Sequence, residues 1–124
     1  MKYYLTTPLY YVNATPHIGH AYTTILADVI ARFYRQLNFD TFFLTGLDEH
    51  GQKVQEAANS RKVEAQVHCD EMAPRFLELW EKLHISNDDH IDVECNYTYG
   101  SSRNLAHFRF HYLNGIVLHN TRPL

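Results

Sequence analysis

The N-terminal part of the chain alternates between strand patterns and a long helical pattern. Residues 2–7 are aromatic and β-branched, which is typical of a short strand. A helical pattern follows from Ile18 to about Leu37, and Asn38 is a residue type that ends helices in the left-handed conformation. Residues 40–45 form a near-continuous apolar run, typical of a strand buried on both faces of a parallel sheet. This order predicts a right-handed β-α-β unit and therefore an α/β fold.

The predicted helix has one apolar face, and its charged residues lie elsewhere. The apolar residues recur every three or four positions, which is the spacing of a single helix face. They are Ile18, Tyr22, Ile25, Val29 and Phe33, whereas Asp28, Arg32 and Arg35 fall outside this face.

The loop before this helix ends in Pro-His-Ile-Gly-His and is the best candidate for a site of chemistry. It would lie at the carboxyl end of the strand, where the N–H groups of a helix's first turn favour anions and above all phosphate. His17 and His20 share one face and can donate N–H groups to phosphate oxygens. Gly19 has no Cβ, so a flat ring could approach the backbone. Two other interpretations stay open, surface histidines in a polar turn and half of a metal site.

A second polar loop, residues 46–51, follows the second strand. Parallel pairing places it at the same edge of the sheet as the histidine loop. A carboxylate there can hold the ammonium group of an amino acid while the helix terminus holds phosphate, which describes a site for two substrates. The alternative is that Asp48 or Glu49 caps the next helix.

Two further helical patterns follow. Residues 52–60 predict a short amphipathic helix that covers one face of the sheet, and residues 63–83 predict a longer helix with a core-forming apolar stripe. Pro74 interrupts this stripe, so we expect a kink or a break at about Ala73. The stripe consists of Cys69, Met72, Phe76, Leu79, Trp80 and Leu83.

Composition restricts the function classes. A net charge of −3 argues against a strongly basic nucleic-acid-binding surface, so any such contact would be local. Cys69 and Cys95 form no Cys-x-x-Cys pair, so neither a zinc knuckle nor a disulfide framework is indicated. No apolar run reaches the length of a membrane span, and the N-terminus lacks the pattern of a signal peptide. We therefore expect a cytoplasmic chain without a membrane segment.

Four ordered strings resemble the methionyl-tRNA synthetases, a family of the class I aminoacyl-tRNA synthetases. The resemblance covers residues 3–89, about seven-tenths of the chain. Leu47 departs from the pattern, because the family usually carries a small polar residue there that could form a hydrogen bond. The strings are Thr6 to Asn13 followed by Pro16-His-Ile-Gly-His20, then Phe43-Leu-Thr-Gly-x-Asp-Glu-His-Gly51, then Glu71 to Phe76, then Leu79 to Asp89.

The resemblance implies a fold and an activity. The fold would be the N-terminal half of a Rossmann-like nucleotide-binding fold, a parallel β-α-β unit with extra helices that is incomplete in this chain. The family, an aminoacyl-tRNA ligase, joins methionine to ATP with Mg²⁺ and then passes the methionyl group from methionyl-adenylate to tRNA(Met). His17 and His20 would be the catalytic residues that contact the ATP phosphates, and Gly19 would let adenine lie on the backbone.

The same strings imply a methionine site. Leu9 and Tyr11 would line the pocket for the methionine side chain, and Asp48 would bind the methionine ammonium group. Asn13 and His50 lie inside the same strings and would support the two loops.

Beyond Asp89 the resemblance ends, and residues 90–124 match nothing in the family pattern. We expect a partial catalytic domain over residues 1–89 and a tail over 90–124 that is foreign to the fold or partly disordered. In the tail, Leu105, Phe108 and Tyr112 fit one face of a helix, and residues 115–119 fit a strand. His107 and His111 are spaced for a metal, but nothing supplies a third ligand, so no metal or zinc site is expected.

Two hypotheses follow for the function. In the first, the chain is a synthetase by descent and an incomplete or inactive fragment, because the family's Lys-Met-Ser-Lys-Ser loop, its cysteine knuckles and its anticodon-binding domain do not occur in these 124 residues. Binding of tRNA(Met) by the fragment would then be weak or lacking. In the second, it is a non-catalytic nucleotide-binding or structural remnant.

Overall fold

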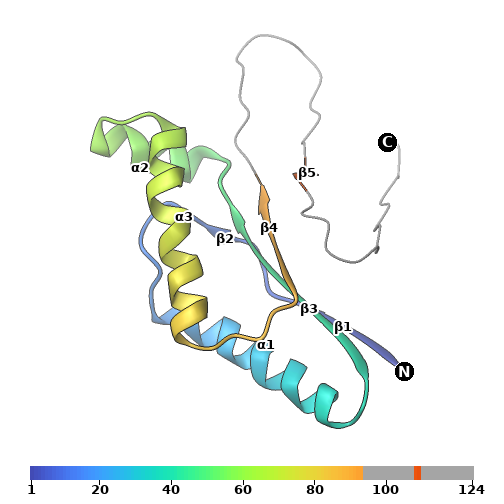
Figure 1. Cartoon of the computed structure of the whole chain (residues 1–124). Helices are drawn as coiled ribbons and strands as arrows, with labels where there is room; N and C mark the ends of the chain where they lie inside the picture. Colours follow the sequence, from blue (N-terminus) through green and yellow to red (C-terminus); the bar gives the residue numbers. More distant parts are fainter. Residues whose placement is uncertain (94–107, 110–124) are drawn as a thin grey trace.

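The computed structural model describes residues 1–93 and 108–109, which form an α/β fold (Figure 1). The predicted β-α-β unit is confirmed, and the long helix ends as expected, because Asn38 follows it with a φ of 61°. The elements are β1 (Lys2–Thr6), β2 (Tyr10–Tyr11), α1 (Ile18–Gln36), β3 (Asp40–Asp48), α2 (Gln52–Arg61), α3 (Ala65–Lys82), β4 (Asp89–Val93) and β5 (Phe108–Arg109).

The sheet is organised around β3, which is parallel to β1, β2 and β4. β1 pairs with the first part of β3, and β2 pairs with its last two residues. Pro8, which has no backbone N–H, lies between these two short strands. β4 pairs with the second half of β3, and the carboxyl ends of the parallel strands therefore lie at one edge. The two predicted loops meet at this edge.

β5 corrects one prediction about the tail. Phe108 was expected on a helix face, but Phe108 and Arg109 form a short strand that pairs antiparallel with β4. Pairing with β4 supplies partners to backbone groups at a sheet edge, and this long-range contact overrides the local helical spacing. The helix predicted around Leu105 and Tyr112 and the strand predicted over 115–119 otherwise lie outside the described residues, as do His107 and His111.

α1 and α3 pack against the same face of the sheet (Figure 1). Phe43 contacts Ala27 and Ala31 of α1, whereas Leu47, four residues along the same strand, lies in the cluster formed with α3. On the opposite face, Phe42 is only partly buried. Residues 43–47 are nevertheless all buried, so the predicted burial of both faces is confirmed for this part of β3, although among the described residues helices cover only one of the two faces.

The face that α1 buries is not its apolar face. Its buried residues are Thr24, Ala27, Asp28 and Ala31, whose small or polar side chains let the helix lie close to the sheet. Six large apolar residues of α1 are exposed by 41–88%. They are Ile18, Tyr22, Ile25, Leu26, Val29 and Phe33.

α3 buries four of the six residues of the predicted apolar stripe, and the other two, Leu79 and Leu83, are partly buried. Cys69, Met72, Phe76 and Trp80 are buried in one cluster with residues of β2, β3 and α2. The helix continues through Pro74, so of the two predicted alternatives the break is wrong and the kink stays a prediction. Pro74 and Asp70, whose carbonyl loses its helical donor, are both exposed, and water can satisfy that carbonyl.

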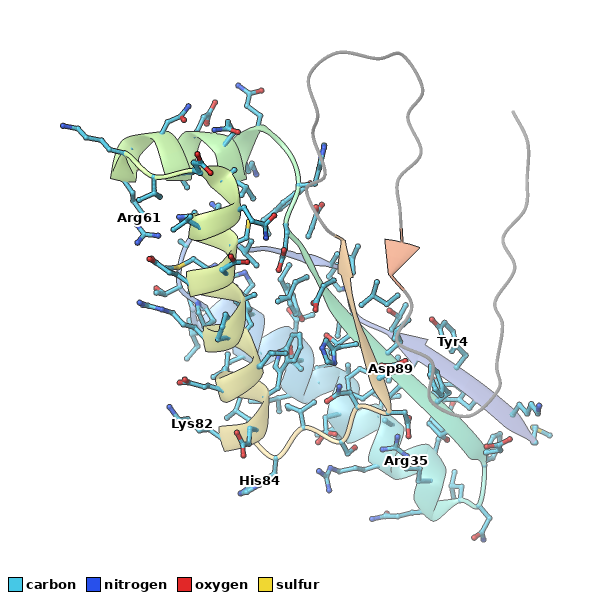
Figure 2. The ribbon with its side chains drawn as sticks, turned by 45° about the horizontal axis from the view of Figure 1, so that its top comes forward. Tyr4, Arg35, Arg61, Lys82, His84 and Asp89 are labelled. Carbon is cyan, nitrogen blue, oxygen red and sulfur yellow. The ribbon has the colours of Figure 1, made fainter. Side chains whose placement is uncertain are left out.

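Charged residues tie α1 to the segment between α3 and β4. One carboxylate oxygen of Asp28 accepts from the Ser86 N–H at 2.7 Å and from its hydroxyl at 2.5 Å, and the other accepts from Arg32 at 2.6 Å. Arg35 donates to Ser86 and to Asp88, and Figure 2 shows it beside the start of β4. Burial acts to raise the pKa of Asp28, but the bonds from Ser86 and Arg32 outweigh it and lower that pKa.

Candidate functional site

The two histidines of the loop cap α1 together. His17 is the N-cap residue, and its Nδ1 accepts from the Gly19 N–H at 3.0 Å. The Nδ1 of His20 accepts from the His17 N–H at 3.1 Å, which completes a capping box. The rings stack with their centroids 3.9 Å apart. The His20 ring thus holds the backbone of His17, and the His17 ring holds the backbone of Gly19, at the first turn of the helix.

These hydrogen bonds assign the protons on the rings. A backbone N–H can only donate, so both Nδ1 atoms accept and each neutral ring carries its proton on Nε2. Burial lowers the pKa of His20, and positive charge on His17 lowers it further. The His20 ring therefore stays neutral near pH 7, and its Nε2–H is the group that can donate to a ligand.

The core fixes the position of His20. Its ring meets Tyr10 edge-on at 5.0 Å and Phe76 at 5.2 Å between centroids. The Thr24 hydroxyl donates to the His20 carbonyl at 2.9 Å, and it accepts from the Tyr10 hydroxyl at 2.9 Å. β2, α1 and α3 together hold this ring, whereas His17 is exposed.

Gly19 has a structural role that the sequence did not reveal. A Cβ at this position would lie 2.8 Å from Cε1 of His17, inside normal contact distance. The His17 ring can cover the first turn because residue 19 has no side chain. The predicted approach of a flat ring to this backbone remains a prediction.

Leu9, Tyr11 and Asp48 form a second group, on the sheet face opposite α3. Tyr11 and Asp48 are register partners at the ends of β2 and β3. Their neighbours Tyr10 and Leu47 point into the α3 core, so Tyr11 and Asp48 point away from it. Leu9 lies against Gly46, where an added Cβ would meet its Cδ2 at 2.7 Å. The three residues with predicted methionine roles thus share one region of the sheet.

The acidic residues of the second loop do not supply the N-cap of α2. That position is Gly51, which has a φ of 104° and no side chain to cap with. The Asp48 carboxylate accepts from the His50 N–H at 2.9 Å, just past the end of β3. This hydrogen bond orients the carboxylate. Its second oxygen is also a hydrogen-bond acceptor and can bind an ammonium group.

A surface pocket of about 430 Å³ lies beside Tyr11. It is lined by Tyr11 and by four residues of the α2 N-terminal turns, and the Lys53 ammonium lies 5.4 Å from the Tyr11 ring centroid. Tyr11 is the one predicted site residue in its lining. The other lining residues are Gly51, Gln52, Lys53 and Glu56.

The structure brings the predicted residues to one edge of the sheet in two separate groups. The histidine pair lies at the start of α1, and Leu9, Tyr11 and Asp48 lie at the ends of β2 and β3. Asn13 is exposed in the turn after β2, and His50 is exposed after β3. Their supporting roles stay predictions, as do the ligand roles of the two groups.

His68 was missed at the sequence level. It is buried on α3, and its two ring nitrogens contact Arg61 and the Val12 carbonyl. The sequence feature that could have revealed His68 is its position, because it is a polar residue directly before Cys69 within an otherwise apolar stripe.

Within residues 1–93 and 108–109, no three His, Cys, Asp or Glu side chains gather in a way that could hold a metal ion. None of the helices in the described part of the chain combines the length and apolarity needed to span a membrane.

Comparison with known proteins connects this arrangement with one family. A family model described as tRNA synthetases class I (M) matches residues 3–115. The match reaches past residue 89, and β4 crosses that position. The division between residues 1–89 and 90–124 stays a prediction.

Individual relatives agree with the family match. A methionine–tRNA ligase of Thermotoga maritima is 59% identical over 88 residues, covering 71% of this chain and 14% of the relative. The ligase of Rickettsia conorii is 56% identical over 89 residues, covering 72% and 18%. Mycobacterium tuberculosis methionyl-tRNA synthetase bound by methionyl-adenylate superposes with a TM-score of 0.73 and 44% identity, over 75% of this chain and 18% of that one. The chain therefore spans less than a fifth of these relatives' length.

Proposed function

This chain belongs to the class I tRNA synthetases (M), and we propose on that premise that it holds ATP and methionine for the formation of methionyl-adenylate. The observation that carries the proposal is the histidine pair. Both rings use Nδ1 to cap α1, so both present Nε2–H as their donor at a helix N-terminus that already favours phosphate.

The reaction needs positioning and charge stabilisation more than covalent catalysis. A methionine carboxylate oxygen attacks the α-phosphorus, the bond between that phosphorus and the bridging oxygen to the β-phosphate breaks, and pyrophosphate leaves with the electron pair. His17 and His20 would donate to the phosphate oxygens as negative charge shifts among them. Gly19 would leave the backbone open for adenine to approach.

The second group of residues suits the amino acid. Asp48 would accept from the methionine ammonium group, oriented by its bond to the His50 N–H. Leu9 and Tyr11 would contact the thioether side chain, and Asn13 and His50 would support the loops. An apolar lining binds leucine nearly as well as methionine, so the choice between them rests on the family relationship.

The proposal also covers Mg²⁺ and tRNA. Mg²⁺ prefers phosphate oxygens and water, so we propose that it arrives with ATP. The tRNA would be held weakly by this chain alone, because a net charge of −3 offers little general attraction to phosphate.

We further propose that the chain does not complete the reaction on its own. It lacks a Lys-Met-Ser-Lys-Ser sequence to stabilise the leaving pyrophosphate. Loss of one well-placed donor to a transition-state charge typically lowers the rate by a factor of about 10² to 10³. The second candidate is a non-catalytic nucleotide-binding module, and it predicts ATP binding without any chemistry.

Calorimetry with ATP tests the phosphate role. The double variant His17→Ala, His20→Ala should lose ATP binding, whereas His84→Asn should bind as the wild type does, because His84 follows α3 and Asn tolerates its positive φ. Equal ATP binding before and after the double substitution would refute the role of the histidines.

Pyrophosphate exchange with methionine and ATP separates the two candidates. Slow, methionine-dependent exchange that His17→Ala, His20→Ala abolishes would support the synthetase proposal. ATP binding with no exchange would favour the non-catalytic module. An exchange rate within about tenfold of that of an intact synthetase would refute the proposal that the chain does not complete the reaction on its own. The missing donors alone should lower the rate by more than that.

A further inference from the structure

His68 is a buried imidazole with both nitrogens engaged. The side chain is 2% exposed and lies on α3 directly before Cys69 of the apolar cluster. Its Nε2 lies 2.9 Å from the Val12 carbonyl oxygen, and its Nδ1 lies 2.9 Å from a guanidinium nitrogen of Arg61. A polar ring in such a place is destabilising unless its nitrogens are hydrogen-bonded, and here both are.

The hydrogen-bond partners of His68 are compatible with only one protonation state of its ring. A guanidinium can only donate, so Nδ1 of His68 accepts from Arg61, and a carbonyl can only accept, so Nε2–H donates to Val12. Arg61 is itself paired with Glu71, whose pKa is lowered by that hydrogen bond and charge. The result is a chain of contacts from Glu71 through Arg61 and His68 to the backbone of Val12.

Val12 lies between the two groups of the candidate site. Its N–H donates to the Asp48 carbonyl at 3.3 Å, which ties it to the end of β3. Its carbonyl accepts from His68, which ties it to α3. Tyr11 directly precedes it, and the loop to His17 directly follows. Whatever fixes the Val12 peptide groups therefore fixes the start of the histidine loop.

We propose that His68 is a positioning residue that holds the histidine loop in place by binding the Val12 carbonyl, with Arg61 and Glu71 setting its orientation and tautomer. The last step, an effect on ATP and methionine, rests on the proposed function. The hold on the loop does not depend on that function and can be measured without a ligand.

Three substitutions in the full chain separate positioning from mere core filling. In His68→Gln the side-chain amide nitrogen can take the place of Nε2 and still donate to Val12. In His68→Asn the shorter side chain reaches only the place of Nδ1, so it can accept from Arg61 but loses the donor to Val12. His68→Leu fills the site and lacks both contacts.

Amide hydrogen exchange is the first measurement. The N–H of Val12 is bonded to the Asp48 carbonyl, and the N–H groups of His17 and Gly19 are bonded to the two histidine rings. In His68→Asn and His68→Leu they should exchange about tenfold faster than in the wild type, and in His68→Gln they should be close to it. The N–H groups of Ala27 and Ala31 in α1 serve as the internal control and should not change. Equal loop protection in the Gln and Asn variants would overturn the proposal.

Nitrogen NMR of His68 in the wild type adds a test that survives if a variant fails to fold. A proton on Nε2 and a bare Nδ1 support the proposal, and a proton on Nδ1 overturns it.

ATP calorimetry on the same proteins distinguishes the two proposals. A wild type that shows the exchange pattern but binds no ATP would refute the proposed function alone, whereas ATP binding with unaltered exchange in all three variants would refute the role of His68 alone.

Discussion

α1 and α3 carry apolar stripes of similar length, but only α3 buries its stripe. Phe76 of α3 is fully buried, whereas Phe33 of α1 is 55% exposed. α1 instead turns alanines and a carboxylate toward the protein, and Asp28 is only 7% exposed. The two helices are therefore held in different ways, one by burial of large apolar side chains and one by close backbone approach and hydrogen bonds.

This difference limits what helical periodicity can show. A stripe indicates which face of a helix can be buried favourably, but burial also needs a facing surface. β2, β3 and α2 provide that surface for α3. For α1, Phe43 faces two alanines, and Ser86 and Asp88 face the charged residues.

The largest expected effect is on the buried stripe. Phe76→Ala should destabilise the protein by about 3–5 kcal/mol, because it leaves a cavity in the α3 cluster and removes a wall of the His20 site. Urea unfolding measures it. The neighbouring Leu77→Ala, at a partly exposed position, is the control and should have a clearly smaller effect. Equal losses in the two variants would contradict the assignment of this face as core.

Asp28 should be the next most sensitive position. Asp28→Ala removes the acceptor for the N–H and the hydroxyl of Ser86 and for Arg32. The loss of these charged hydrogen bonds should lower the free energy of unfolding by about 2–3 kcal/mol in total. Asp70→Ala, an exposed aspartate of α3, should change the unfolding free energy by less than about 0.5 kcal/mol. If the two variants unfold at the same urea concentration, hydrogen bonding does not hold α1.

The contribution of Asp28 should depend on pH in a defined direction. Its folded pKa lies below the ordinary value of 3.8, so its stabilisation is fully present above that value and is lost as pH falls through the folded pKa. The stability difference between the wild type and Asp28→Asn should therefore be constant near neutral pH and shrink below about pH 4. A difference that grows on acidification would contradict the lowered pKa.

The smallest effect should be on the exposed stripe of α1. Phe33→Ala makes the same chemical change as Phe76→Ala but should alter the unfolding free energy by only about 0.5 kcal/mol. The pair compares the two helices directly in one urea experiment. A loss above about 2 kcal/mol for Phe33→Ala would show that this face is covered in solution.

Much of the fold and part of the site could be predicted from local signals. The β-α-β order, the end of α1 at Asn38 and the core stripe of α3 follow from residue types within one or two turns of chain. The two polar loops were predicted to meet because parallel strands place their carboxyl ends together, and they do. Each of these features depends on backbone preference or on a period of 2 or about 3.6 residues, which a sequence displays directly.

Tertiary structure decided the features that join residues far apart in the chain. The buried face of α1 depends on Asp28 meeting Ser86, and the fixed start of the histidine loop depends on Val12 meeting His68. Neither contact can be predicted from the residues around its partners. A hydrogen bond between residues about 58 positions apart produces no periodic pattern in the sequence. The sequence determined which segments form helices and strands, and long-range contacts determined which of their faces are inside, because burial depends on the surface that each face meets.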